Sequence, residues 1–258
     1  MTPGEINILR VLRYREGTVR AVEDEVVVER PLDIYVNGRR RFACMRLPGR
    51  DVELAAGLCL SHGLARRGQD IAGIVAEGEG RITVSIPGLA EGDDRTVIQI
   101  TSSSGEMDFS RGREAGLVIP AAHHITAGMI FAMNDDFRRR QDVFRRTGGA
   151  HASAVYDGEG GLLAFAEDVG RHNAFDKCAG RLLLDNSTGK AVAGVLSSRI
   201  SFEMVMKALS LNLEIVTGMS APTTAAVDLA EKCGLTLAGF VRDGCFNLYS
   251  RPERVALS

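Results

Sequence analysis

Polar side chains gather in five short segments of this 258-residue sequence, each at a junction between predicted elements. The richest is 167–177, EDVGRHNAFDK, where two carboxylates end a predicted strand and a helix begins. We expect His172, Asn173 and Asp176 to lie close together on the surface of that helix. Because open α/β sheets place ligands at the carboxyl ends of strands, the segment predicts a ligand site. A surface helix capped by Asp168 is the alternative.

Residues 196–203 and 217–224 repeat the pattern of a strand, a hydroxyl-rich turn and a helix. In the first, Ser201 is placed to cap the helix, and free N–H groups there would attract an anion. In the second, Ser220 precedes a proline in the first helical turn, which is typical of a helix start. Capping alone explains the first segment as well as anion binding does, and it is the favoured explanation of the second.

Arginine dominates the two remaining segments. Residues 240–245, FVRDGC, place Arg242 at a strand end, where its guanidinium could hold a phosphate with two hydrogen bonds. The Asp-Gly pair in this segment is typical of a hairpin turn, which is the simpler explanation. The arginines at 138–140 and 145–146 follow aspartates at 135–136, an order that favours a solvated helix face over an anion site.

The cysteines exclude several classes of site. They are Cys44, Cys59, Cys178, Cys233 and Cys245. No two form a C-x-x-C pair, which excludes a zinc ribbon and a local redox dithiol, and the odd, scattered set does not form a disulfide scaffold. The sequence also lacks the zinc-deaminase signature, a P-loop and a dinucleotide-binding glycine motif, so we expect no structural metal. Cys59 and Cys178 lie on predicted helices among apolar neighbours, where we expect buried, inert thiols.

Charge and hydropathy exclude two kinds of partner. The net charge of −2 does not favour a nucleic-acid binder, which would usually be strongly basic. No apolar run approaches the roughly 20 residues of a membrane span, and the start of the chain lacks a secretory signal pattern. We therefore expect a cytoplasmic protein with no nucleic-acid or membrane partner.

Strands dominate the predicted first half of the chain. Alternating β-rich residues predict strands over 7–14 and 18–28, and Asn-Gly predicts a hairpin between 32–36 and 39–47. A helix follows over 51–62, and further strands over 82–86 and 95–100.

Strands and helices alternate in the second half. We expect a long helix over 120–144 carrying His123 and His124, and then helices over 169–184, 201–211 and 221–233 between short strands. This alternation predicts a mainly parallel sheet with helices on both faces. The predicted boundary divides the chain into a strand-rich α+β domain, 1–115, and an α/β domain, 116–258.

Eight segments together resemble the FdhD family, the accessory proteins of formate dehydrogenase maturation. They are RPLDIYVNG (30–38), PGRDVELAAGLCLSHG (48–63), TSSSG (101–105), RTGGAHASAVYD (146–157), EDVGRHNAFDK (167–177), LSSRISFEMVMKAL (196–209), SAPTTAAVDLA (220–230) and GFVRDGCFNLYS (239–250). The resemblance implies that the larger domain is a cytidine-deaminase-like α/β/α domain without the zinc site.

The resemblance also implies an activity and partners. Family members accept sulfur from a cysteine desulfurase as a persulfide and pass it to the molybdenum or tungsten bis(molybdopterin guanine dinucleotide) cofactor, which is bound as cargo and delivered to apo formate dehydrogenase. A homodimer is implied as well. The cofactor is associated with the segment that here comprises Phe240, Val241, Arg242, Asp243, Gly244 and Cys245. We add Arg171, His172, Arg199 and Ser220 as candidate cofactor contacts, because guanidinium groups and helix N-termini suit phosphates.

One loop departs from the family pattern T-S-S-C-G-x-C, whose first cysteine carries the persulfide. Here Ser104 and Met107 stand at the two cysteine positions. A hydroxyl cannot form a persulfide and a thioether has no ionisable S–H, so this loop cannot transfer sulfur by the family route. The alternatives are a non-catalytic cofactor chaperone, a relay through Cys245, or a divergent hydrolase that uses His151, His172 and Asp176.

Overall fold

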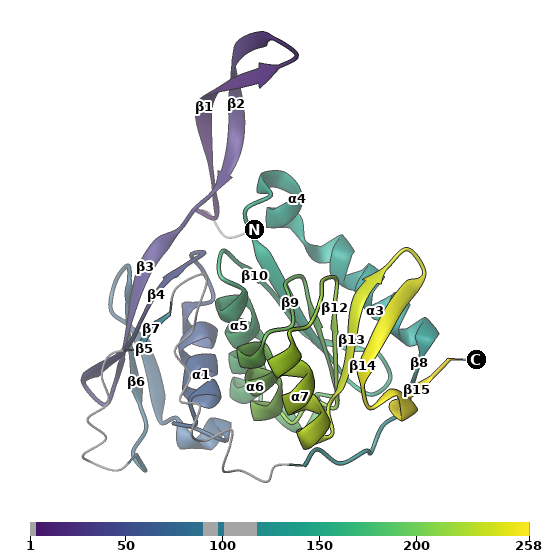
Figure 1. Ribbon diagram of the computed structural model, residues 1–258. Helices are drawn as coiled ribbons and strands as arrows, with labels where there is room; N and C mark the ends of the chain where they lie inside the picture. Colours follow the sequence, from purple (N-terminus) through teal and green to yellow (C-terminus); the bar gives the residue numbers. More distant parts are fainter. Residues whose placement is uncertain (1–3, 90–97, 101–117, 258) are drawn as a thin grey trace.

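The computed structural model describes residues 4–89, 98–100 and 118–257, with the side chains at 99 and 100 excepted (Figure 1). Ser104 and Met107, which the resemblance aligns with the two family cysteines, lie outside the described residues.

The N-terminal part is built from hairpins, as predicted. Its elements are β1 (Ile6–Arg15), β2 (Thr18–Val27), β3 (Arg30–Val36), β4 (Arg39–Arg46), α1 (Asp51–Ser61), β5 (Gly73–Ala76), β6 (Arg81–Ser85) and β7 (Ile98–Ile100). Strands β1 and β2 form a separate antiparallel pair, while the others form a sheet in the order β5-β6-β3-β4-β7. Asn37 and Gly38 join β3 to β4 with φ values of 48° and 78°, the left-handed backbone that a two-residue hairpin turn requires.

A six-stranded sheet forms the C-terminal part, in the order β10-β9-β11-β12-β13-β14. The strands are β9 (His151–Tyr156), β10 (Leu162–Asp168), β11 (Ala193–Leu196), β12 (Ile215–Gly218), β13 (Thr236–Arg242) and β14 (Cys245–Ser250). The expected mainly parallel sheet is wrong: only β11–β12 and β12–β13 pair in parallel. Short turns join β9 to β10 and β13 to β14, and a short turn connects antiparallel neighbours.

Helices cover both faces of this sheet, as expected. They are α3 (Ala127–Arg140), α4 (Asp142–Thr147), α5 (Arg171–Leu184), α6 (Phe202–Ser210) and α7 (Thr224–Cys233). Helices α5, α6 and α7 bury apolar side chains on one face, and α3 packs on the other through Ile130, Met133 and Phe137 (Figure 1). Near the C-terminus, β15 (Val255–Ala256) pairs in parallel with β8 (Ile125–Thr126), and β8 contacts α3. No helix among these described elements is long and apolar enough to cross a membrane.

The predicted helix over 120–144 is wrong at its start and is interrupted. Helix α3 begins at Ala127, where the Thr126 hydroxyl accepts a hydrogen bond from the Met129 N–H at 3.1 Å, and Gln141 separates it from α4. The backbone before it is held by a distant group, because the N–H groups of Ala122 and His123 donate to the Glu214 carboxylate. His123 and His124 therefore precede the helix rather than lying on it.

A common core joins the two parts. One apolar cluster runs from Leu32 on β3 to Leu237 on β13. Helix α1 packs so closely on α5 that a Cβ atom at Gly57 would lie 1.9 Å from the Asp176 carbonyl oxygen, and one at Gly180 would lie 1.8 Å from the Glu53 carbonyl oxygen. Both positions need glycine because the neighbouring atoms are backbone, which cannot move aside.

Candidate functional site

Four of the five polar segments leave the C-terminal sheet at one edge. Strand β9 is antiparallel to both β10 and β11, and β11, β12 and β13 are parallel, so β10, β11, β12 and β13 all point the same way. They end at Asp168, Leu196, Gly218 and Arg242. We call this the carboxyl edge, and it is the place where open α/β sheets hold ligands.

Backbone hydrogen bonds join the loops of the carboxyl edge to one another. The Ile200 N–H donates to the Ala221 carbonyl at 3.1 Å, and the Thr223 N–H donates to the Ile200 carbonyl at 3.0 Å. The Phe240 N–H donates to the Ser220 carbonyl at 3.2 Å. The loops that carry Arg199, Ser220 and Phe240 therefore form one connected surface, although they are far apart in the sequence.

The segment 240–245 is a hairpin turn, as its Asp-Gly pair predicted. Asp243 and Gly244 have φ values of 51° and 75°, and Arg242 pairs with Cys245 across the turn. Phe240 also has a positive φ, 56°, at a bulge in β13, while Val241 is buried. Arg242 and Cys245 are exposed, and the Arg242 guanidinium lies 5.9 Å from the centre of the Phe240 ring.

Two arginines bring positive charge to the middle of the carboxyl edge. Arg171, half-buried, is the first residue of α5, and its pKa is lowered by burial and by Arg199, while Glu203 opposes the shift. Arg199 is exposed. His151 begins β9 at this edge, and burial together with the Arg171 charge lowers its pKa. The edge therefore favours an anionic ligand.

The N-terminus of α5 has no side-chain cap among the described residues. Its N-cap is Gly170, and its first turn holds no acidic residue. The predicted capping by Asp168 is wrong, because Asp168 Oδ1 accepts from the Gly170 N–H and from the Asn173 side chain instead. A helix N-terminus without a side-chain cap, next to the Arg171 guanidinium, favours an anion.

The other two predicted caps are also wrong. Ser201 occupies the N-cap position of α6, but its hydroxyl donates to Glu203 at 2.8 Å and caps no N–H group. Helix α7 begins at Thr224 with Thr223 as its cap, so Ser220 lies four residues before the helix, in the loop that pairs with Phe240. Ser201 therefore binds a side chain of its own helix, and Ser220 contributes its backbone carbonyl to the loop rather than a cap.

Three residues of the EDVGRHNAFDK segment, Asp168, Asn173 and Lys177, hold the two parts of the molecule together. Asp168 Oδ2 accepts from the Leu47 N–H at 3.1 Å and contacts Lys177 Nζ at 2.7 Å. Lys177 donates to the Leu47 carbonyl, and Asn173 donates to the Met45 carbonyl. No local pattern indicates this role, because the partners are backbone groups about 130 positions away in the chain.

Asp176 is a structural residue, which removes the hydrolase alternative. It is fully buried, and its carboxylate contacts Lys207 Nζ at 2.6 Å and accepts from the Ser61 hydroxyl at 2.6 Å. Burial raises its pKa, while Lys207 and Ser61 oppose the shift. The predicted surface cluster of His172, Asn173 and Asp176 is wrong, since all three side chains are buried.

His172 is buried without a partner among the described residues. Its side chain is 1% exposed, and neither ring nitrogen makes a hydrogen bond there. Burial, followed by the charges of Lys207 and Arg171, lowers its pKa to about 2. The ring is therefore neutral, with a free donor and a free acceptor in the first turn of α5.

Cys245 differs from the other cysteines. Burial raises the thiol pKa of Cys44, Cys59 and Cys178 to about 12 and also raises that of Cys233. These four are buried, which confirms the expectation for Cys59 and Cys178, and Cys245 is exposed. Sulfur transfer needs a thiolate that a reaction partner can reach. Cys245 is the exposed cysteine of this chain, so it meets this condition.

The arginine-rich stretch of α3 and α4 is a solvated face, as predicted. Arg140 contacts Asp136 at 2.7 Å and Arg139 contacts it at 3.8 Å, while Arg146 contacts Glu25 on β2. No group of three His, Cys, Asp or Glu residues that could hold a metal ion occurs within 4–89, 98–100 and 118–257.

Comparison with known proteins accounts for the motifs of the carboxyl edge. The model of the FdhD/NarQ family matches residues 27–256. This chain belongs to the FdhD/NarQ family. It is 37% identical over 269 residues to the sulfur carrier protein FdhD of Streptomyces coelicolor, covering 96% of this chain and 95% of that one. The FdhD/NarQ relative of the same name from Sulfolobus acidocaldarius is 35% identical over 98% of this chain and 100% of its own length.

The fold is shared with a solved structure. A candidate formate dehydrogenase accessory protein from Desulfotalea psychrophila superposes with a TM-score of 0.84 over 98% of this chain and 100% of that chain, at 22% identity. The mixed α/β architecture with a strand-rich N-terminal part is therefore common to both proteins.

Proposed function

We propose that this chain is an accessory protein for the maturation of a formate dehydrogenase, and that its carboxyl edge binds the guanine dinucleotide parts of the molybdenum cofactor as cargo. Family membership and the names of the relatives support the first part. One observation carries the second: four polar segments, bearing Arg171, Arg199 and Arg242, meet at one edge beside the uncapped α5 N-terminus.

The chemistry of the carboxyl edge suits such a cargo. A guanine dinucleotide presents phosphate oxygens, and guanidinium groups bind these with paired hydrogen bonds. The N-terminus of α5, which has no side-chain cap, adds a second kind of phosphate donor. Phe240, half-buried beside the Ser220 loop, offers an aromatic face on which a purine can stack.

Guanosine diphosphate is the probe for this site. We expect Arg199→Ala and Arg242→Ala each to weaken its binding about tenfold or more by isothermal titration calorimetry, because each removes a charged hydrogen-bond donor to phosphate. Arg66→Ala, at an exposed position outside the edge, is the matched control and should leave the affinity unchanged. Equal affinities for all four proteins would refute the site.

Sulfur transfer is a second candidate function, favoured by the exposure of Cys245 within 240–245. In that step the Cys245 thiolate attacks the outer sulfur of a desulfurase persulfide, one S–S bond forms on Cys245 and the desulfurase thiolate leaves. Incubation with a cysteine desulfurase and ³⁵S-cysteine tests it. Label that Cys245→Ala abolishes assigns a relay to this chain, whereas no label on any cysteine leaves a cofactor carrier without sulfur chemistry.

The family resemblance supports three finer proposals. The C-terminal sheet, with helices on both faces, supports the cytidine-deaminase-like assignment of that part. The homodimer is proposed on the resemblance alone, whereas the cytoplasmic location is also the prediction made from charge and hydropathy. Gel filtration with light scattering tests the dimer directly.

A further inference from the structure

The β1–β2 hairpin is an arm that projects from the body of the molecule (Figure 1). Its two ten-residue strands pair only with each other, and a two-stranded hairpin is at best marginally stable in water by itself. The base is fastened to the body: Arg146 Nε lies 2.8 Å from Glu25, and Val27 packs against Gly149. The tip, residues 12–21, is exposed throughout.

One face of the arm is apolar at its tip. Cross-strand register places Leu12 opposite Ala21 and Tyr14 opposite Val19, so these four side chains lie on the same side of the ribbon. Leu12 is 76% exposed, Tyr14 71% and Val19 59%. Toward the base, the Arg10–Glu23 pair ends this apolar surface. A contiguous exposed apolar surface of this kind marks an interaction site.

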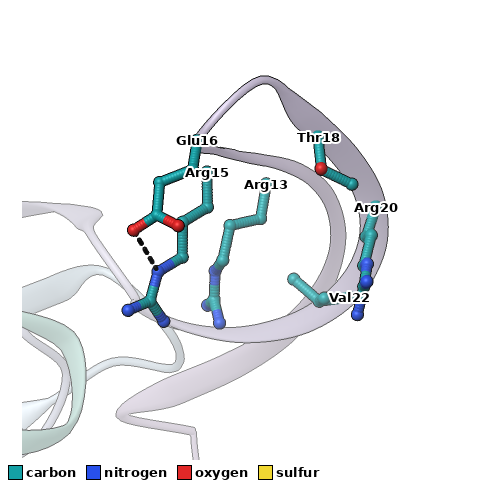
Figure 2. A pocket seen from close by; sticks show the side chains of 6 residues that line it. All are labelled: Arg13, Arg15, Glu16, Thr18, Arg20 and Val22. Atoms are coloured by element: carbon teal, nitrogen blue, oxygen red, sulfur yellow. Dashed lines mark ion pairs between the residues drawn. The ribbon is translucent and has the colours of Figure 1, made fainter.

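The opposite face of the tip is basic and hollow. Arg13 lies directly opposite Arg20, with Arg15 on the same side, and they line a concavity of about 360 Å³ together with Thr18 and Val22. Figure 2 shows the three guanidinium groups turned toward the same side of the curled ribbon. The carboxylates near them are Asp24, 3.3 Å from Arg13, and Glu16, 3.9 Å from Arg15. Like charges placed opposite each other destabilise a ribbon, and carboxylates from a partner would relieve this repulsion.

The back-to-back arrangement of these faces limits what can bind the tip. A membrane surface would contact one face and leave the other in water, and a nucleic acid on the arginines would leave Leu12 and Tyr14 exposed. A protein groove with one apolar wall and one wall of carboxylates contacts both faces at once. The complementary charge also steers association and sets its orientation.

The arm stands beside the carboxyl edge. Its base residue Val27 contacts Gly149, and His151, two residues further along, begins β9 at that edge. The arm also extends beyond the same end of the molecule as the β13–β14 turn (Figure 1). A protein that grips the arm is therefore positioned to receive a cargo held at the edge.

We propose that the tip of the β1–β2 arm docks this chain onto the apo formate dehydrogenase that receives the cofactor, in a groove with an apolar wall and an acidic wall. The identity of the partner rests on the proposed function. The assignment of the tip as a docking surface rests on the residues of the arm itself.

Binding of the full-length chain to apo formate dehydrogenase from the same organism, measured by biolayer interferometry, tests the proposal. We expect Leu12→Ser and Arg20→Glu each to weaken binding about tenfold or more. Matched controls are Val75→Ser on exposed β5 and Arg66→Glu, which should leave the dissociation constant unchanged. Replacing 12–21 by Asn-Gly keeps the lower ladder up to the Val11–Val22 pair and should abolish binding. The loss of affinity on raising salt should be smaller for Arg20→Glu than for the parent.

Guanosine diphosphate titration of the same proteins separates this proposal from the previous one. If the arm variants bind the nucleotide normally but lose the apoenzyme, the docking surface is supported. Equal apoenzyme affinity for the parent, Leu12→Ser and Arg20→Glu overturns it, even where nucleotide binding is intact. Binding of the parent to phosphatidylserine–phosphatidylcholine vesicles, with none to the apoenzyme, also overturns it. Arm-dependent apoenzyme binding without nucleotide binding would instead overturn the cargo site alone.

Discussion

At the scale of single residues, two buried ion pairs explain the polar residues of segment 167–177, where the sequence predicted a ligand site. Asp176 pairs with Lys207, and Asp168 pairs with Lys177, all of them buried. Removing one partner of such a pair leaves an uncompensated charge away from water, which costs more than the pair contributes. These residues therefore act on stability and on the joining of elements, whereas Arg199 and Arg242 are exposed at the carboxyl edge.

Lys207→Met tests this assignment. We expect it to lower the free energy of unfolding by about 3–5 kcal/mol in urea titration, because the Asp176 carboxylate loses its counter-charge. The double variant Asp176→Asn with Lys207→Met should recover part of the loss. Exposed Lys190→Met is the control, and a loss of similar size there would contradict the assignment.

His172 predicts a pH dependence of stability. Its folded pKa, about 2, lies below the ordinary value of 6.5, so the unfolded chain binds a proton near pH 6.5 that the folded chain does not. Stability is then fully present above pH 6.5 and falls as the pH drops below it. Between pH 7.5 and 5.5 this one group should remove about 1.4 kcal/mol. Urea titrations of the parent and His172→Gln measure the difference, and parallel pH profiles would contradict it.

At the scale of elements, the contact between α1 and α5 depends on two glycines. Glycine lowers the intrinsic stability of a helix, so its presence within α1 and within α5 needs a reason in packing. The reason is the closeness of the opposing backbone, 1.9 Å from a Cβ built at Gly57 and 1.8 Å from one built at Gly180. These helices carry Ser61 and Asp176, so their approach also brings that buried hydrogen bond together.

Gly57→Ala should destabilise the protein by about 3 kcal/mol, although alanine is the better helix former, because the added methyl group forces the helices apart. Thermal unfolding measures the effect. Gly73→Ala on β5, where a Cβ meets nothing within 4 Å, is the control. A higher melting temperature for Gly57→Ala would show that the helices can separate without cost.

At the scale of the whole molecule, the two parts share one core and fold together. The apolar cluster includes side chains from β3, α1, α5 and α6, and Leu47 of the N-terminal part hydrogen-bonds to both Asp168 and Lys177. The carboxyl edge therefore depends on the N-terminal part, since the loop that begins α5 is fastened to it.

We expect the full chain to unfold in one calorimetric transition, because one apolar cluster takes side chains from both parts. A fragment of residues 116–258 should lose the near-ultraviolet circular dichroism of packed side chains, since the α1-facing side of α5 becomes exposed. Two well-separated transitions, or a fragment with a native-like spectrum, would contradict this expectation.

Local patterns were enough to predict most elements and the hairpin turns. Asn37-Gly38 and Asp243-Gly244 carry their turn geometry in their own backbone preferences, and the helix and strand periods depend on neighbouring residues. The start of α3 was missed because Glu214, some 90 positions away, binds the backbone before it. The antiparallel pairs of the C-terminal sheet were missed because the order of strands and helices along the chain does not specify the direction of each strand in the sheet.

The sequence by itself determined the family motifs, the absence of cysteine at 104 and 107, and the placing of polar segments after strands. Only the tertiary structure decided which of those polar groups face water. Asp168, Asp176 and Lys177 are buried and hold elements together, whereas Cys245 is exposed. Arg171, Arg199 and Arg242 lie at one edge of the sheet. The physical reason is that Asp168, Asp176 and Lys177 also hydrogen-bond to groups more than 100 positions away, which no local pattern contains.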